Sequence, residues 1–399
     1  MNIENPNLYV EINKSNYICI VGKYDINQNF NIIEKIIIPC REIKNKKFIN
    51  INDASKKIKE HVEIIEKKLN FIFKEVTVII EDFDFTCTNI SGFKKLNGSQ
   101  IQKENISYIL NSLKTTISES EKEKTILHIF NSSSILDGTR VENLPIGLFG
   151  NFYNHVLTFF LIQNNDLKNI KLIFNKSNLE IKKVILKSFC EGVQLIKQKS
   201  FSENFVLIKI GKETSKIIIF DQKSFKYLEH FDFGTDIILK DVTKICSLDH
   251  KTIINILSEN YFRNKSFNTD EVIEEKFFKQ DSYRKIRKNL ILDIVKARIE
   301  EILNIIFNKN INIDAFKFNN FDSYLIIEDD IISGNFEENF NHYLSVSEKS
   351  KINLSEDFQV DTLIASASNL SIYGWSKEAI PIMQTKNSLI TRIFKSIFG

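Results

Sequence analysis

Residues whose types could do chemistry are scattered along this sequence and form no recognisable catalytic pattern. The motifs Gly-x-Ser-x-Gly and His-Glu-x-x-His and the phosphate-binding P-loop are all absent. The six histidines are dispersed, and a lone histidine in an apolar strand, such as His128 or His155, is typically structural. The five cysteines form no Cys-x-x-Cys pair, so the sequence predicts neither a disulfide framework nor a metal site.

Two smaller polar groups each allow a structural and a functional interpretation. Asp137-Gly138 is most simply a turn. Arg298 and Glu301 stand three positions apart, so on a helix they form either a solvated ion pair or part of a surface that binds a partner.

The final segment, residues 388–399, has the spacing of an amphipathic helix. Its apolar stripe leaves Arg392 and Lys395 on the other side and consists of Leu389, Ile390, Ile393, Phe394, Ile397 and Phe398. Such a helix is too short to span a bilayer but suits the headgroup plane. Burial of the stripe contributes roughly 6–10 kcal/mol, most of which is offset by ordering the segment. One copy should therefore bind a membrane weakly and an array firmly. The alternative is a terminal helix docked on the protein's own core.

Composition excludes several classes of protein. The chain has 399 residues and a net charge of +3, with Lys and Glu interspersed, which argues against a nucleic-acid partner. The N-terminus lacks the basic and apolar regions of a signal peptide. The longest apolar run, Val156 to Ile162, is too short to cross a membrane. We expect a cytoplasmic protein with at most peripheral membrane contact.

A strand–turn–strand pattern occurs twice, about two hundred residues apart. The first copy is Leu8–Ile12 with Tyr17–Val21, and the second is Asn204–Ile210 with Lys216–Phe220. Each is followed by a third strand, and the first by a helix over Asp53–Leu69. The repetition predicts a duplicated α/β architecture.

Two segments interrupt this scheme. Residues 85–163 contain a predicted helix, Gln102–Thr116, and strands such as Ile126–Phe130, which suffices for a small α/β insert. Residues 246–314 contain a long predicted helix, Tyr283–Phe307.

The insert carries a motif that resembles the FtsA family of actin-fold bacterial cell-division proteins. Strand Ile126–Phe130 is followed by Asp137-Gly138, Asn143, Pro145, Gly147 and Gly150 in the order of that family's motif. Three further stretches are similar to family motifs: Gly234 to Asp241, Ala297-Arg298 with Glu301, and Ala365 to Gly374. The amphipathic tail resembles the family's membrane-targeting helix.

The resemblance implies a nucleotide site whose motifs are eroded here. The family's Asp-Ile-Gly-Thr-Ser-Lys reads Glu11-Ile12-Asn13-Lys14-Ser15-Asn16, and Asp-Ile-Gly-Gly-Gly-Thr-Thr reads Lys209-Ile210-Gly211-Lys212-Glu213-Thr214-Ser215. The adenosine loop reads Glu328-Asp329-Asp330-Ile331-Ile332-Ser333-Gly334. The matching positions are Glu11, Lys14, Ser15, Gly211, Thr214, Gly234, Asp241 and Gly334. ATP is the cofactor that the family implies, and the erosion predicts weak or no binding and negligible hydrolysis.

By this resemblance the fold is α/β and actin-like, a duplicated ribonuclease-H-like fold with four subdomains. Subdomain 1A is expected over 1–84, 164–200 and 358–376, the inserted subdomain 1C over 85–163, 2A over 201–245 and 315–357, and 2B over 246–314. A linker, 377–387, precedes the membrane helix, 388–399.

The function implied is tethering of FtsZ filaments to the cytoplasmic face of the inner membrane at the division site. Arg298 and Glu301 would help to bind the FtsZ C-terminal peptide, and the insert would recruit later division proteins. Self-association into filaments is also implied. The alternatives are a pilus-assembly protein of the PilM type, which lacks such a tail, and an actin-fold kinase or chaperone ATPase, which needs intact phosphate loops.

Overall fold

The computed structural model describes residues 5–25, 29–197, 202–258, 271–279, 281–313, 316, 321–333, 352–354 and 360–379. The chain divides into two compact units. Unit 1 comprises residues 1–201, 220–227 and 358–399, and unit 2 comprises 202–219 and 228–357. Residues 220–227, which the sequence assigned to the second half, therefore group with unit 1.

The centre of unit 1 is a five-stranded mixed sheet. In spatial order its strands are β11 (Glu180–Leu186), β6 (Glu75–Ile80), β1 (Asn7–Ile12), β2 (Asn16–Tyr24) and β3 (Phe30–Pro39). β6 runs parallel to β1 and to β11, and β2 is antiparallel to β1 and to β3. β1 and β6 are buried almost throughout, as expected for strands covered on both faces.

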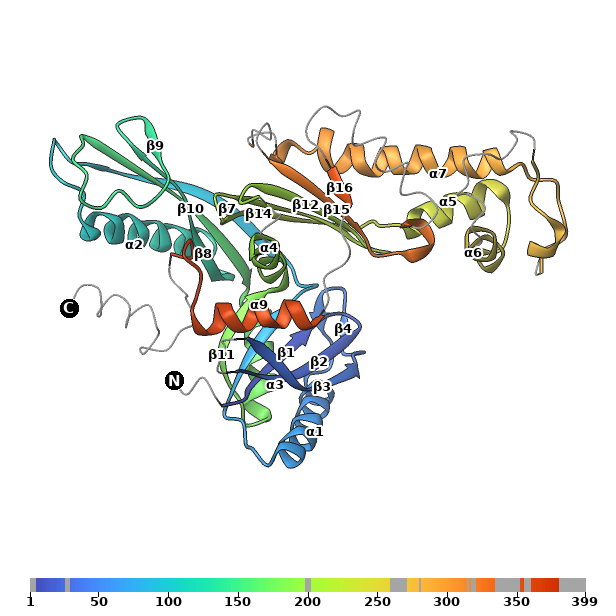
Figure 1. Cartoon of the computed structure of the whole chain (residues 1–399), viewed down its shortest axis with the longest axis horizontal. Helices are drawn as coiled ribbons and strands as arrows, with labels where there is room; N and C mark the ends of the chain where they lie inside the picture. Colours follow the sequence, from blue (N-terminus) through green and yellow to red (C-terminus); the bar gives the residue numbers. More distant parts are fainter. Residues whose placement is uncertain are drawn as a thin grey trace. The chain divides into compact units, whose positions relative to one another are not determined.

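Four helices pack around this sheet as two pairs. One pair is α1 (Ile51–Leu69) with α3 (Asn164–Lys176), and the other is α4 (Lys187–Lys197) with α9 (Val360–Ile372) (Figure 1). α1 begins at the N-cap Asn50, whose side chain accepts from the amide of Asp53. The short strands β4 (Ile43–Lys44) and β5 (Lys47–Phe48) form a separate hairpin.

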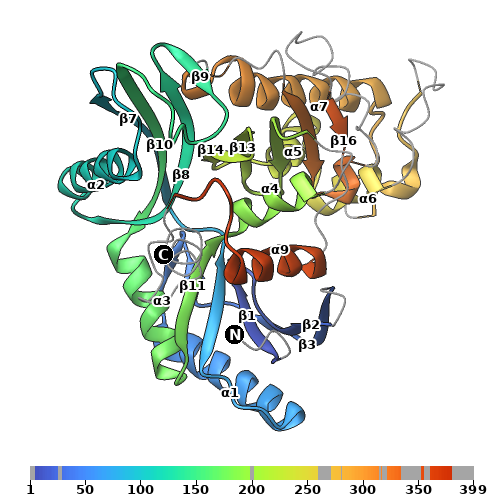
Figure 2. The ribbon, with the colours of Figure 1, turned by 60° about the vertical axis from the view of Figure 1, so that its left-hand side comes forward.

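The insert forms its own layer within unit 1. Its antiparallel sheet has the order β7 (Phe85–Lys95), β10 (Phe152–Gln163), β8 (Lys124–Leu136) and β9 (Thr139–Val141). Helix α2 (Lys103–Ser120) covers one face (Figure 2). Its apolar side packs against residues of the strands such as Tyr153 and Leu157, and consists of Ile106, Ile109, Leu110, Leu113 and Ile117. This is the α/β insert that the sequence predicts.

A second five-stranded sheet belongs to unit 2 except for residues 220–227. Its strands have the order β14 (Ser224–Phe231), β13 (Ser215–Asp221), β12 (Phe205–Ile210), β15 (Asp322–Ile327) and β16 (Ile352–Leu354). Its helices include α5 (Asp236–Cys246), α6 (His250–Ser258) and α7 (Lys288–Leu303). The strand order is that of unit 1 with β12, β13, β14, β15 and β16 in place of β1, β2, β3, β6 and β11. The two sheets share one topology, which accounts for the repeated strand–turn–strand pattern.

The long predicted helix of unit 2 is shorter than the sequence indicated. It begins at Lys288 and not at Tyr283, because the backbone of residues 286–288 is bonded to residues 271–273 instead. It continues into a π-helical turn, Asn304–Asn308. Leu290 is 43% exposed and does not lie on the buried side of the helix. The buried line is Ile291, Val295, Ile299, Ile302 and Leu303.

Residues 375–379 form a strap that ties the end of α9 to the insert. The amides of Asn131 and Ala379 donate to the carbonyls of Lys377 and Ile129, at 2.7 Å each. Glu378 is fully enclosed, and its two oxygens contact Nδ1 of His128 at 2.8 Å and Nζ of Lys183 at 2.9 Å. Burial raises the pKa of Glu378, but the charge of Lys183 and the contact with His128 outweigh burial and hold this pKa at about 2. Residues 377–379, which the sequence assigned to a linker, thus belong to the folded body.

We predict that Glu378→Ala lowers the free energy of unfolding by about 3–5 kcal/mol, because it leaves Lys183 and His128 buried without their carboxylate. Urea denaturation measures the change. Glu142→Ala, on an exposed side chain that lies near the strap, should change stability by less than about 0.5 kcal/mol. A loss for Glu378→Ala no larger than this control would contradict the prediction.

Candidate functional site

The backbone amides of the turn after β1 are hydrogen-bonded to oxygens of the protein. Asn13 donates its amide to the carbonyl of Asn16 at 3.1 Å. The amides of Ser15 and Asn16 donate to the Asn13 side chain at 3.0 and 2.7 Å. The amide of Lys14 donates to the Asp82 carboxylate at 2.9 Å. A loop that cradles a phosphate must direct such amides at the ligand, and here the chain's own oxygens occupy them.

A cation of the chain lies among the carboxylates next to this turn. Lys187, the first residue of α4, contacts Glu11 at 3.0 Å and Glu81 at 2.7 Å. Burial lowers the pKa of Lys187, but the negative charges of Glu81, Glu11 and Glu191 outweigh burial and hold this pKa well above its usual range. We call Glu11, Glu81 and Glu191 the carboxylate cluster of unit 1. Lys187 remains charged and neutralises part of it.

The corresponding turn of unit 2 is packed directly against the start of α5. The amide of Gly211 donates to the carbonyl of Thr214, and the carbonyl of Gly211 accepts from the amide of Thr235, both at 2.9 Å. The amide of Asp236 donates to the carbonyl of Lys212 at 2.8 Å. A helix N-terminus binds anions through free amides, and loop carbonyls occupy these.

Gly234 is required by this close approach. A Cβ atom at this position would lie 2.1 Å from the Gly211 oxygen and 2.6 Å from the Lys212 oxygen. Gly211 is less restricted, since its Cβ would lie 3.0 Å from the Thr214 oxygen and 3.2 Å from the Glu328 carboxylate. Backbone packing explains Gly234 without a ligand.

Charged side chains lie beside Gly211. Lys209, 3% exposed, pairs with Glu328 at 2.6 Å. Asp329 accepts from the Thr235 hydroxyl at 2.6 Å and from the amides of Ile331 and Ile332. Both Glu328 and Asp329 are therefore bonded within unit 2.

These contacts do not fit the Mg·ATP that the family resemblance implies. In unit 1 the loop amides are bonded to protein oxygens, and a lysine lies between the carboxylates that would face a metal ion. In unit 2 the amides at the start of α5 are bonded, and a Lys–Glu pair lies beside the loop. Among the residues that the structure describes, no group of three or more His, Cys, Asp or Glu side chains is arranged to hold a metal.

Asp241 and Arg298, which the sequence assigned to two different sites, belong to one ion-pair cluster. Nε of Arg298 on α7 contacts the Asp241 carboxylate on α5, and Nη1 contacts Glu301 at 2.6 Å. Asp241 thus lies further along α5 than the loop residues, and its carboxylate is engaged by Arg298. The i, i+3 pair Arg298–Glu301 forms as its spacing predicts.

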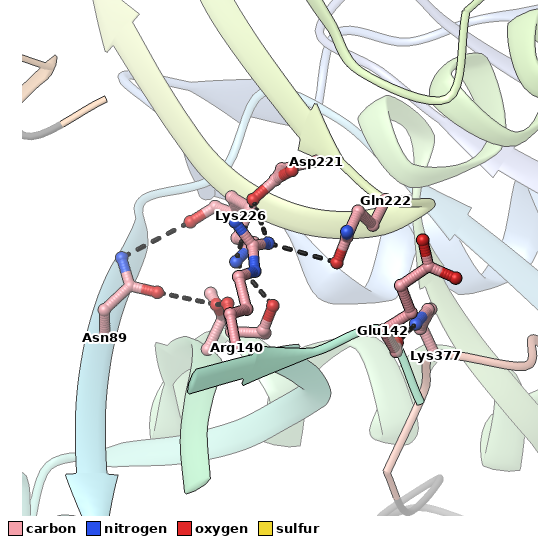
Figure 3. Close-up of polar contacts among 9 residues, drawn as sticks. Asn89, Arg140, Glu142, Asp221, Gln222, Lys226 and Lys377 are labelled. Atoms are coloured by element: carbon pink, nitrogen blue, oxygen red, sulfur yellow. Dashed lines mark hydrogen bonds and ion pairs between the residues drawn. The ribbon is translucent and has the colours of Figure 1, made fainter. Parts of the chain in front are cut away.

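The insert is fastened to residues 221–226 at the tip of the β13–β14 hairpin, all within unit 1 (Figure 3). Arg140 on β9 donates to Asp221 at 2.7 Å and to Gln222 at 3.1 Å. Lys226 contacts Asp221 at 3.3 Å and donates to the carbonyl of Ser132 on β8 at 2.6 Å. Burial lowers the pKa of Lys226 to about 8. These bonds fix the insert on the unit.

The two strand histidines are buried. His128 contacts Glu378 in the strap, and burial lowers its pKa. His155 is 1% exposed, and burial lowers its pKa to about 4. Asp137 shapes the insert, as its φ of 48° allows a turn and its carboxylate accepts from the amides of Asn151 and Phe152.

Gly334 and the membrane-helix residues lie outside the described residues. No helix among the described residues is long and apolar enough to cross a membrane. Sequence reasoning missed Lys187, Glu81 and Asp82. A signal for them existed, because Glu81 and Lys187 directly follow parallel strands, Asp82 comes one residue after Glu81, and such strand ends meet at one edge of a sheet.

Comparisons with known proteins identify the relatives of this chain. No family model matches the sequence. Six known proteins match, all named cell division protein FtsA. The Buchnera aphidicola protein is 18% identical over 89% of this chain and 85% of its own length. The Borreliella burgdorferi protein is 19% identical over 96% and 94%, and the Bacillus subtilis protein is 20% identical over 76% and 70%.

A solved structure confirms the fold. The PilM-PilN type IV pilus biogenesis complex contains a chain that matches 92% of this chain and 98% of its own length, with a TM-score of 0.53 and 10% identity. The actin-like fold that the sequence predicts is therefore confirmed, as is the resemblance to FtsA, since the chain is similar to proteins of that name over most of its length.

We predict that Gly234→Ala lowers the free energy of unfolding by about 3 kcal/mol, because its Cβ overlaps backbone oxygens that cannot move independently. Gly211→Ala is the matched control and should cost about 1 kcal/mol, since its neighbours include the flexible end of Glu328. Denaturation in urea measures both. Equal losses would show that the close approach of the loop to α5 does not restrict Gly234.

Proposed function

We propose that this divergent FtsA relative acts in cell division by tethering FtsZ filaments to the cytoplasmic face of the membrane. The observation that carries the proposal is the match to proteins named FtsA over as much as 96% of the chain. The amphipathic pattern in residues 388–399 supports the membrane part of the proposal. It also argues against the pilus-assembly alternative, because proteins of the PilM type lack such a tail.

Partner binding is proposed for residues 246–314 of unit 2. Arg298 and Glu301 remain candidates at the edge of this region, with the guanidinium held in position by Asp241. Exposed apolar side chains in the same region suit a peptide of mixed acidic and apolar character, such as the FtsZ C-terminal peptide, and include Val272, Tyr283, Leu290 and Ile311.

The insert is the proposed recruiting surface for later division proteins and for self-association into filaments. Large apolar side chains are exposed where β7 ends and β10 begins, and include Phe93, Ile146, Leu148, Phe149 and Phe152. Their exposed fractions run from 44% for Ile146 to 75% for Phe93. An exposed apolar patch on a rigidly anchored subdomain is typical of an interaction surface.

Co-sedimentation with anionic liposomes tests the tether. We predict that the protein carries FtsZ into the liposome pellet and that Phe394→Glu abolishes this, because burying the new charge in lipid costs several kcal/mol. Thr391→Glu adds the same charge on the polar side of the helix and should retain most of the sedimentation.

Both variants should melt within about 2 °C of the unchanged protein and bind the FtsZ C-terminal peptide equally well by fluorescence anisotropy. A large fall in melting temperature with unchanged sedimentation would instead favour a tail docked on the body. Binding of a PilN peptide in place of the FtsZ peptide would favour the pilus-assembly alternative.

We also propose that the protein does not use ATP hydrolysis. The bonded loop amides and the two internal lysine–carboxylate pairs support this. Isothermal titration with Mg·ATP should show no binding tighter than about 1 mM, equivalent to −4 kcal/mol. A dissociation constant in the low micromolar range would overturn this proposal without affecting the tether.

A further inference from the structure

The two units place charged residues at equivalent positions of their shared topology. Glu11 and Lys209 are each the penultimate residue of the first strand, β1 or β12. Glu81 and Glu328 each directly follow the strand that runs parallel to it. The amide of Glu81 donates to Ile12 at 3.2 Å and that of Glu328 to Ile210 at 2.9 Å, so the backbones correspond as well.

The units neutralise these carboxylates in different ways. In unit 2 the first strand itself supplies the cation, as Lys209 contacts Glu328 at 2.6 Å. In unit 1 that position is Glu11, which is 1% exposed, and the cation comes from α4 as Lys187. A buried carboxylate such as Glu11, with the half-buried Glu81 beside it, requires a counter-charge. In each unit a lysine therefore lies at the same edge of the sheet, but the lysine comes from a helix in unit 1 and from the first strand in unit 2.

We propose that Lys187 is a built-in counter-ion for Glu11 and Glu81 that takes the place of a bound divalent cation. Its ammonium lies 3.0 Å from Glu11 and 2.7 Å from Glu81. A metal ion at the same place would be repelled by this ammonium. Lys209 has the same role beside Glu328 in unit 2.

This proposal goes beyond the proposed lack of ATP hydrolysis. It rests on contacts within each unit and does not depend on the tether. It predicts that removal of Lys187 creates a demand for an external cation. We therefore compare the full-length protein with Lys187→Ala, which leaves space, and with Lys187→Arg, which keeps the charge. Melting temperatures are measured with 10 mM MgCl₂, CaCl₂ or MnCl₂ and in NaCl of matched ionic strength.

Lys187→Ala should melt about 10 °C below the unchanged protein in NaCl, because it leaves carboxylates buried without their partner. Divalent cations should restore at least about 3 °C by binding the folded form. The unchanged protein and Lys187→Arg should shift by less than about 1 °C. A response of Lys187→Ala no larger than that of Lys187→Arg would overturn the proposal.

A second variant covers the case in which Lys187→Ala does not fold. Adding Glu81→Gln removes one negative charge, so the double variant should melt at least about 4 °C above Lys187→Ala, or be recovered folded where the single variant is not. Glu81→Gln alone serves as its control. A double variant no more stable than the single one would show that Lys187 acts through packing and not as a counter-ion.

Discussion

The buried carboxylate of Glu378 is the interaction on which the organisation of unit 1 depends. It contacts His128 on a strand of the insert and Lys183 on an edge strand of the central sheet, while Lys183 also donates to the Leu370 carbonyl of α9 at 3.2 Å. One side chain thus joins the insert, the sheet and the last helix. Because a buried charge is stable only with its partners in place, these three elements must assemble together. The chain that leads to the amphipathic tail therefore starts from a fixed point.

The same constraint recurs at three other lysines of the described residues. Lys187, Lys209 and Lys226 each lie beside carboxylates of their own unit. In each unit a lysine of the chain itself supplies part of the counter-charge at the strand ends as soon as the chain folds. A ligand changes a conformational equilibrium only through interactions that differ between the two states, and these ion pairs reduce what a bound cation would gain there.

The sequence predicted the elements better than it predicted their polar contacts. The duplicated strand–turn–strand pattern and the α2 helix follow from local periodicity, and both are present. The start of α7 was misplaced because residues 286–288 bond to residues distant in sequence, which no local pattern reveals. Lys187 is 106 residues from Glu81, and Glu378 is 250 from His128. Pairs at such separations depend on topology, so local patterns give no sign of the role of Lys187. Asp241 was assigned to the nucleotide site from motif order alone, while its partner Arg298 lies on another helix.

The two proposals, a membrane tether and a body that does not use ATP, together have a consequence for regulation. A single tail would gain little free energy on binding, because ordering it offsets most of the apolar burial. With no nucleotide switch in this scheme, membrane attachment would be set by the number of copies held together. Copies aligned on one filament, or on each other through the insert, convert a weak single contact into a firm multivalent one, since each further tail binds at high effective concentration. The strap strengthens this effect. It fixes the chain as far as Ala379, so that only a short stretch of sequence separates the folded body from the tail. A short stretch keeps the tails of neighbouring copies close together and raises their effective concentration. Control of attachment would then lie with the assembly of partners and not with the chemistry of the loops.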